Sequence, residues 1–392
     1  MWRFRVWAIV LLFLVGGVFV TWMGMHVIRA RIQRPIVAEI KAAGGSAYYD
    51  YQIGDRAILP ATAPPGSRAV RFLFGDDIYA TVKVVAFLDP KTSDANVARL
   101  HELPELLDVL LTGTGVSDRC IDDLLRIRRL RSLNLSDTSI SPDGLLRLAS
   151  SSTLQHLTLD GTGITDGHLR QLPHFPDLQF LQIIHAPVTN AGIQALGSIH
   201  RLRQLDLYKT PSVSDAGILA LGQLKSLERL EIFQTGLTDA SLQTIANMHR
   251  LRSLRLDGHS ITDNAFGPLA ALSDLEVLQL RDTGVGDEAM MTIASLSKLR
   301  TLVLTDTHVS DVGLVHLTAL KDLAQLDISH THVTDNGLKR LDQLKSLALL
   351  DVEIGSGISM TGVDALKSKL PNCTIHCWSF ERDDSGVMTQ IR

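Results

Sequence analysis

Four side chains with metal-binding chemistry occur at matching places in this sequence. His308 and His332 are 24 residues apart, and Asp306 and His330 each precede one of them by two residues. If these segments stack as neighbouring strands, the rings of His308 and His332 lie about 5 Å apart. Three imidazoles and a carboxylate could hold a transition metal. The alternative is an exposed column of polar turn residues. We favour this alternative and predict no metal site and no cofactor.

A second candidate is a regular column of carboxylates, which would suggest calcium. The column consists of Asp215, Asp239, Asp263, Asp287, Asp311 and Asp335. Most of these aspartates follow a serine or threonine, as in Thr334-Asp335. A hydroxyl side chain can cap a helix, and a carboxylate in the first helical turn is favoured by the helix dipole. We therefore interpret the column as a series of helix starts rather than calcium ligands.

Signatures of catalysis are missing from the sequence. The segment 161–167 is rich in glycine, but its spacing does not match Gly-x-Gly-x-x-Gly, and a similar turn recurs at 113–115. We find no P-loop, nucleophile elbow or kinase motif. The three cysteines, Cys120, Cys373 and Cys377, are interpreted as packing residues. We predict that the protein is not an enzyme, has no catalytic residues and takes no small-molecule substrate.

The elements that carry these residues are set by an internal repeat. The pattern Leu-x-x-Leu-x-Leu recurs every 24 residues, with one interval of 25, and a period of this length is typical of solenoids. The repeats start at Leu106, Leu130, Leu154, Leu178, Leu202, Leu227, Leu251, Leu275, Leu299, Leu323 and Leu347. Degenerate copies start at Val82 and Leu370.

Each repeat predicts a strand, a turn and a helix. Leu254 and Leu256 are two residues apart and point to the same face of a strand. A threonine follows eight positions after most starts, as at Thr114, Thr138, Thr162, Thr235 and Thr283, where a buried hydroxyl can satisfy backbone groups of the turn. Leucines at helical spacing come next, so that neighbouring repeats close a common core.

These repeats resemble the leucine-rich-repeat superfamily, in its 24-residue variant with a Thr-Asp-x-Gly-Leu helix start. The resemblance implies an α/β solenoid with a parallel concave sheet and convex helices. The segment 44–51 followed by Phe74-Gly75-Asp76-Asp77 is also similar to bacterial membrane-anchored proteins of this type. Similar repeats occur in F-box substrate receptors, but no F-box precedes the array here.

The N-terminus predicts a membrane anchor. Val6 to Ile28 carries no charge and is long enough to cross a bilayer core of about 30 Å, with Trp7 and Trp22 near its ends. We expect residues 6–28 to form a transmembrane helix, 29–81 a cap, 82–377 the solenoid and 378–392 a polar tail that frays. Within the cap, a helix is expected to start at Arg34-Pro35 and to end at Gly44-Gly45, before a strand. The sequence leaves open on which side of the membrane the solenoid lies.

The predicted concave face carries the candidate binding site. Outward strand positions in most repeats are small or polar, but neighbouring repeats between 180 and 257 carry large side chains. The candidate partner-binding residues are Phe180, Gln182, Ile184, Gln204, Asp206, Tyr208, Arg229, Glu231, Phe233, Arg255 and Asp257. Exposed aromatic residues beside arginines are typical of protein interaction hot spots.

We therefore predict a membrane-tethered scaffold that binds a protein on the concave face. One alternative is a structural or envelope-organising protein that uses the cap or the convex helices. Another is a metal- or ligand-responsive sensor based on the histidine turns. The net charge is −4 and no long basic run lies outside the membrane flank, which argues against a nucleic-acid partner.

Overall fold

The computed structural model describes the backbone of residues 2–54, 63–161, 163–355, 357–382 and 388–391, and the side chains between residues 20 and 378 within those ranges. Two compact units divide the chain. The N-terminal unit comprises residues 1–158 and 174–177, and the C-terminal unit comprises residues 159–173 and 178–392.

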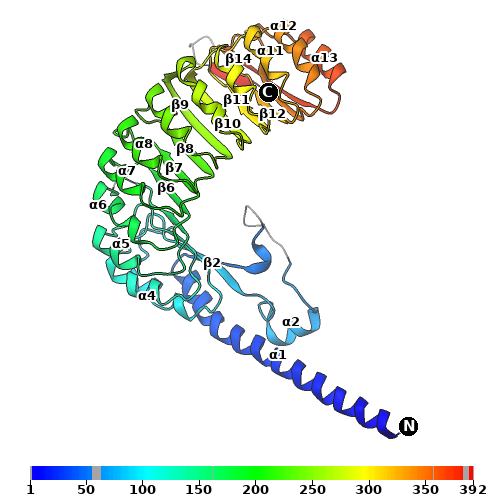
Figure 1. The fold of residues 1–392 in the computed structure, drawn as a ribbon. Coiled ribbons are helices and arrows are strands. Elements are labelled where there is room, and N and C mark those ends of the chain that lie inside the picture. The colour runs from blue at the N-terminus through cyan, green and yellow to red at the C-terminus, as the bar shows by residue number, and fades with distance from the viewer. Residues whose placement is uncertain (1, 55–62, 162, 356, 383–387, 392) are drawn as a thin grey trace. The chain divides into compact units, whose positions relative to one another are not determined.

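The N-terminal unit begins with one long helix and continues into the first repeats (Figure 1). Its helices are α1 (Trp2–Ala42), α2 (Arg68–Phe74), α3 (Asp94–Val97), α4 (Ile121–Leu125) and α5 (Pro142–Leu148). Its strands are β1 (Ser46–Tyr49), β2 (Val82–Ala86), β3 (Asp108–Leu110), β4 (Ser132–Asn134) and β5 (His156–Thr158). Strands β2 to β5 pair in parallel, and β1 pairs antiparallel with β2.

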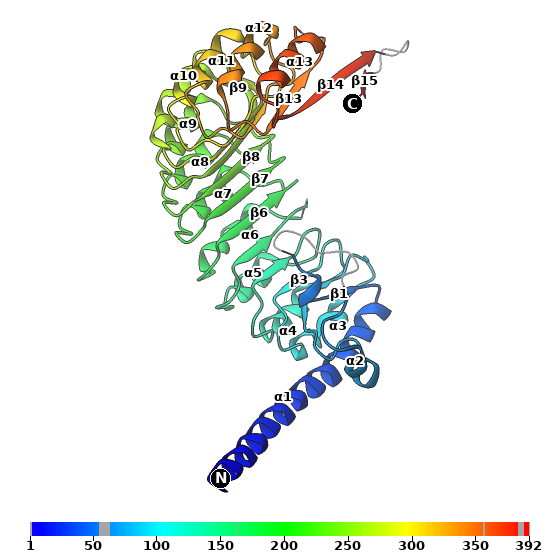
Figure 2. The same cartoon turned by 90° about the vertical axis from the view of Figure 1, so that its right-hand side faces the viewer.

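The C-terminal unit is a run of parallel strands with helices on one side (Figures 1 and 2). Its strands are β6 (Phe180–Ile184), β7 (Gln204–Tyr208), β8 (Arg229–Phe233), β9 (Ser253–Thr262), β10 (Val277–Gly284), β11 (Thr301–Val303), β12 (Gln325–Asp327), β13 (Leu349–Glu353), β14 (Thr374–Arg382) and β15 (Met388–Ile391). Its helices are α6 (Asp166–Leu169), α7 (Asn190–Leu196), α8 (Asp215–Leu221), α9 (Leu242–Ile245), α10 (Ala289–Ile293), α11 (Asp311–Leu317), α12 (Asp335–Leu338) and α13 (Met360–Lys369). We call the side of the strands that faces away from these helices the sheet face; it corresponds to the predicted concave face.

The leucine periodicity sets the core as predicted. Leu254 and Leu256 of β9 are fully buried, and the strands keep their leucines in register across the C-terminal unit, with Leu230 opposite Leu254 and Leu254 opposite Leu278. Each repeat alone could not bury these side chains, because its apolar face needs a neighbouring repeat to cover it.

The threonine column closes the turns after the strands. The hydroxyls of Thr114, Thr283 and Thr307 donate to the carbonyl oxygens of Leu111, Leu280 and Leu304, three residues earlier, over 2.6–3.1 Å. The hydroxyls of Thr210 and Thr235 are buried with no hydrogen-bond partner, so two repeats depart from this rule. Thr162 lies outside the described residues.

The aspartate column does more than start helices. Asp311 accepts two hydrogen bonds from Thr334 of the next repeat, 2.7 Å from its backbone nitrogen and 2.6 Å from its hydroxyl. A Cβ atom placed on Gly337 would lie 2.3 Å from the Asp311 carboxylate, so that position needs glycine. The Thr-Asp-x-Gly pattern thus joins successive repeats by hydrogen bonds from the threonine of one repeat to the aspartate of the repeat before it. It occupies the carboxylate oxygens with neutral donors and supports the helix-start interpretation over calcium.

The start of the chain differs from the prediction in one respect. A separate helix was expected from Arg34-Pro35, whereas α1 runs unbroken from Trp2 to Ala42 with Pro35 inside it. Proline removes one helical hydrogen bond. Ala30 on one side of Pro35 and Ile36 on the other are both buried, so tertiary packing holds the two halves in line. Gly44, with a φ of +76°, ends the helix as predicted.

The predicted membrane segment cannot be followed through its whole length. Most of Val6–Ile28 lies outside the residues whose side chains are described. Within the described residues, no helix has both the length and the apolar character needed to span a membrane.

The C-terminal end also differs from the expectation. The segment from residue 378 was expected to fray, but β14 continues to Arg382 and pairs antiparallel with β15. Backbone pairing with β13, which places Glu353 opposite Trp378, extends the sheet into this segment.

Candidate functional site

The eleven candidate residues all lie on four adjacent strands of the C-terminal unit, β6 to β9. The parallel register sorts most of them into three rows. The first row is Phe180, Gln204 and Arg229; the second is Gln182, Asp206, Glu231 and Arg255; the third is Ile184, Tyr208 and Phe233. Asp257 follows Arg255 on β9.

The third row and Arg255 form a cluster that we call the aromatic patch: Ile184, Tyr208, Phe233 and Arg255. The rings of Tyr208 and Phe233 lie 6.1 Å apart at 57° to each other. The guanidinium carbon of Arg255 lies 4.9 Å from the Phe233 ring centre and 5.9 Å from that of Tyr208. This is the geometry of a cation–π contact, which fixes the arginine above the rings. All four side chains are half-buried, so each keeps some surface exposed to solvent.

Three carboxylates of the candidate set are buried although they occupy outward strand positions. Asp206, Glu231 and Asp257 are 5%, 6% and 8% exposed. Arg229 forms an ion pair with Glu231 and lies 4.0 Å from Asp206. The backbone nitrogen of Gln234, a residue with a φ of +53°, donates to Asp257 over 2.7 Å. These acids therefore position the strands and turns under the aromatic patch.

Burial changes how readily these acids ionise. Burial, with the neighbouring Asp206 carboxylate as the second cause, raises the pKa of Glu231 to about 7, while Arg255 acts in the opposite direction. Burial also raises the pKa of Asp206 and of Asp257 above their ordinary values. The sheet face in this region thus holds a carboxyl group that titrates near neutral pH.

The histidine turns do not form a metal centre. The rings of His308 and His332 stack at 5.8 Å and 11°, close to the spacing predicted from the sequence. His330 instead pairs with Glu353, with its Nδ1 atom 3.0 Å from the carboxylate. Among the described residues, no group of three or more histidines, cysteines or acids is arranged to hold a metal ion.

Sequence reasoning missed a polar pocket further along the sheet face. We call it the C-terminal pocket; it has a volume of about 420 Å³. Its lining residues are Arg281, Thr305, Asp306, Asp327, Ser329, His330, Asp351 and Trp378. A signal for it was present, because Asp327 and Asp351 occupy the same outward strand position in consecutive repeats, and the register places them opposite each other.

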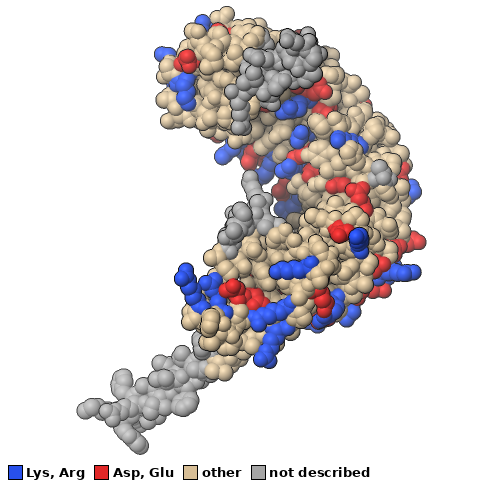
Figure 3. Space-filling model, turned by 180° about the vertical axis from the view of Figure 1, so that it is seen from behind, with Lys and Arg blue, Asp and Glu red and all other residues tan. Residues whose placement is uncertain are grey.

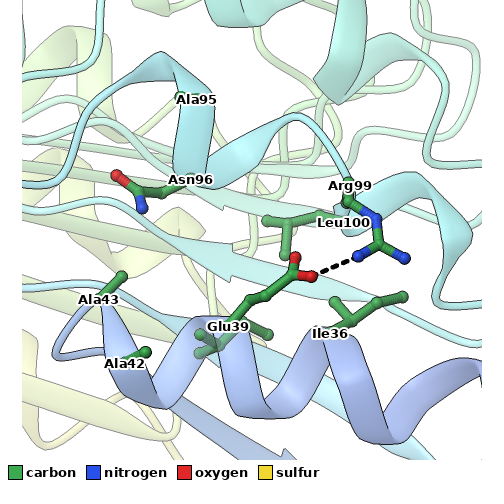
Figure 4. A pocket seen from close by; sticks show the side chains of 9 residues that line it. Ile36, Glu39, Ala42, Ala43, Ala95, Asn96, Arg99 and Leu100 are labelled. Carbon is green, nitrogen blue, oxygen red and sulfur yellow. Dashed lines mark hydrogen bonds and ion pairs between the residues drawn. The ribbon is translucent and has the colours of Figure 1, made fainter.

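A second cavity, of about 360 Å³, lies in the N-terminal unit between the end of α1 and α3 (Figure 4). Alanines and isoleucines make up much of its lining, and Glu39 forms an ion pair with Arg99 across it. Because Glu39 and Arg99 are already paired with each other, we interpret this cavity as a packing gap between the helix and the repeats.

Charge is mixed on the surface of the repeats. On the face drawn in Figure 3, lysines and arginines lie among aspartates and glutamates rather than in one continuous basic area.

The family comparison agrees with this repeat geometry. A family model described as leucine-rich repeat matches residues 128–149, 271–294 and 321–341, each within the predicted array. The chain contains leucine-rich repeats. No curated protein matches its sequence. Stacked repeats of this type present extended surfaces that bind other molecules.

Solved structures with similarity to this chain include bacterial and plant proteins. An internalin of Listeria monocytogenes is 22% identical, with 64% of this chain and 76% of that chain covered and a TM-score of 0.47. A leucine-rich-repeat protein of Leptospira interrogans is 18% identical, with coverages of 71% and 80% and a TM-score of 0.43. A plant peptide hormone receptor, solved with its peptide, is 15% identical, with coverages of 73% and 49% and a TM-score of 0.43. Similarities of this size say nothing about what the present chain binds.

Proposed function

We propose that this protein is a membrane-tethered scaffold that binds a partner protein through the sheet face of β6 to β9. The observation that carries the proposal is the aromatic patch, in which Arg255 is held over Tyr208 and Phe233. Aromatic and arginine side chains dominate the energy of protein interfaces when they are held in place before binding. The buried carboxylates below the patch and the parallel strands on either side supply that rigidity.

The tether is supported by exposed apolar side chains in the N-terminal unit. On α1, Val20, Met25 and Ile28 are each at least 60% exposed, and on α2, Phe72 and Leu73 are 91% and 72% exposed. Apolar side chains gathered in this way mark surfaces that meet lipid or another protein. We assign them to the membrane side of the protein, next to the apolar N-terminal segment.

The test compares three alanine substitutions on the sheet face with three alanine substitutions on the helices. The variant Phe180→Ala, Tyr208→Ala, Phe233→Ala removes the aromatic side chains of the sheet face. The control variant Leu219→Ala, Met291→Ala, Val312→Ala removes apolar side chains that are 59–68% exposed on α8, α10 and α11. Both are expressed at equal level in the source cells, crosslinked, and purified for identification of bound proteins.

We expect the sheet-face variant to lose one specific partner by at least tenfold, because each anchor residue contributes on the order of 1–2 kcal/mol. The control should retain that partner. If the control loses it and the sheet-face variant keeps it, the protein acts through its helices, as a structural protein would. Equal thermal stability of both variants is the condition for comparing them.

A further inference from the structure

The C-terminal pocket combines acids that form no ion pair with lysine or arginine among the described residues, a buried unpaired hydroxyl and an aromatic ring. All three features belong to the sheet face of the C-terminal unit, on strands that follow those of the aromatic patch. Its volume of about 420 Å³ falls within the range of sites that bind small groups.

The carboxylates are satisfied by neutral donors. Asp327 accepts from the Thr305 hydroxyl over 2.7 Å and from the Ser329 backbone nitrogen over 2.9 Å. Asp351 lies 2.9 Å from the Nδ1 atom of His376, which is charged only when protonated. Within the described part of the chain, neither aspartate forms an ion pair with lysine or arginine. A carboxylate without a cationic partner is a favourable site for an incoming positive charge.

Ser329 is the independent sign of a missing ligand. The residue is 6% exposed, and its hydroxyl is buried without a hydrogen-bond partner although it lines the pocket. Buried polar atoms in folded proteins are nearly always paired, so an unpaired one at a cavity wall points to a group that binds there. Its neighbour His330 adopts a φ of +55°, the left-handed conformation that this turn position also has in other repeats, as at Asp282 and Asp306.

The balance of charge decides the class of ligand. Asp306, Asp327 and Asp351 line the pocket against a single cation, Arg281. Arg281 is exposed and forms no ion pair with these acids among the described residues. Trp378, opposite Glu353 in the sheet, adds an aromatic wall that favours a flat or cationic group.

We propose that the C-terminal pocket binds a lysine or arginine side chain of the partner protein. The ammonium or guanidinium group contacts Asp327 and Asp351, the Ser329 hydroxyl accepts one of its hydrogen bonds, and Trp378 covers the aliphatic stem. This assignment rests on the proposed function, since it takes the partner to be a protein that binds along the same face. The aromatic patch would then anchor the partner and the pocket would select a basic residue on it.

The test uses blocked amino acids as probes and the full chain in detergent. N-acetyl-arginine amide, N-acetyl-lysine amide and the neutral N-acetyl-citrulline amide are titrated by calorimetry. We expect saturable 1:1 binding of the two cationic probes and at least tenfold weaker binding of the neutral one. Added salt should weaken the binding, as for any exposed charge pair.

Two variants separate binding from folding. Asp327→Asn with Asp351→Asn keeps an acceptor for the Ser329 backbone nitrogen and an amide that can donate to the Thr305 hydroxyl, and should reduce affinity for the cationic probes at least tenfold. Ser329→Ala should weaken binding about threefold to tenfold, the effect of one hydrogen bond, without changing the melting temperature, because the hydroxyl is unpaired in the free protein. The matched control is Asp322→Asn, on an exposed residue outside the pocket lining.

Failure of this inference is distinct from failure of the proposed function. No saturable binding of either cationic probe, or equal binding of citrulline, overturns the pocket assignment even if partner capture still needs Tyr208 and Phe233. Tighter binding of putrescine than of the blocked amino acids also overturns it, in favour of a free amine. If the triple aromatic variant still captures the partner while the cationic probes still bind, the proposed function alone is overturned.

Discussion

At the scale of single residues, this protein places ionisable groups where burial changes their behaviour. Glu231 is the clearest case, because it lies beneath the aromatic patch with Asp206 beside it in the register. Its carboxyl group has a pKa of about 7 in the folded chain, against an ordinary value of 4.5. The sheet face can therefore change its charge within the physiological range of pH.

The first prediction concerns stability as a function of pH. Because folding raises the pKa of Glu231, its protonated form is the one that the fold favours. The contribution of Glu231 to the free energy of unfolding is therefore fully present below pH 4.5 and is lost as the pH rises through about 7. Relative to Glu231→Gln, the wild type should lose on the order of 1–2 kcal/mol between pH 5 and pH 8, since Arg255 offsets part of the burial.

Urea unfolding at several pH values measures this difference. Glu228→Gln, on a half-buried glutamate of the same repeat that pairs with Arg203, is the control and should show no such trend. A constant difference between wild type and Glu231→Gln from pH 5 to pH 8 would show that Glu231 stays ionised.

Residue-scale features also mark the limit of what the sequence could predict. The outward positions of β6 to β9 followed from the period of two in a strand, and the structure brings those residues together. Their depth did not follow, because the burial of Asp206 and Glu231 depends on the length of side chains in neighbouring repeats. The C-terminal pocket was missed because Trp378 lies after the last full repeat, in a segment that was expected to fray.

At the scale of elements, each repeat is joined to the next by more than its leucines. The aspartate at or just before the start of one helix accepts from the serine or threonine that precedes the next, as in Asp287 to the backbone nitrogen and hydroxyl of Ser310 at 2.8 Å and 2.6 Å. The sequence predicted the helix starts but not this bond, because the two groups are 23 residues apart and meet only through the stacking. Asn190 occupies the same place in one repeat and holds Ser214 through its amide.

The second prediction compares alanine and asparagine at Asp311, because Asn190 shows that asparagine can occupy this place. Asp311→Ala removes both acceptors for Thr334 and should lower the free energy of unfolding by about 1–3 kcal/mol, because a buried donor loses its partner. Asp311→Asn keeps one acceptor and turns the other contact into a donor, as Asn190 does, and should cost less than half as much. Chemical denaturation of both variants measures the two costs. An asparagine variant as unstable as the alanine variant would mean that the charge itself, rather than the paired hydrogen bonds, joins the repeats.

At the scale of the whole molecule, the apolar side chains assigned to the membrane and the proposed binding surfaces belong to different units. The exposed apolar side chains of α1 and α2 belong to the N-terminal unit, whereas the aromatic patch and the C-terminal pocket belong to the C-terminal unit. From Ala30 onward α1 is tied to its own unit by buried residues, including Gln33, whose amide donates to the carbonyl of Ala80 over 2.9 Å. A membrane tether can therefore be removed without touching the part of α1 that holds the cap.

The third prediction concerns membrane attachment through the N-terminal unit. A chain that begins at Thr21 lacks most of the apolar segment but keeps Trp22, whose ring stacks with Tyr79 at 5.8 Å. The full chain should stay in the membrane fraction through an alkaline carbonate wash, whereas the shortened chain should be washed off.

Phe72→Ser with Leu73→Ser in the shortened chain should then weaken its residual binding to lipid vesicles several-fold, because two exposed apolar side chains no longer enter the interface. Leu219→Ser, on a side chain 68% exposed in the C-terminal unit, should leave vesicle binding unchanged. If the full chain is extracted without detergent and does not bind vesicles, the apolar N-terminal surface must instead bind a protein.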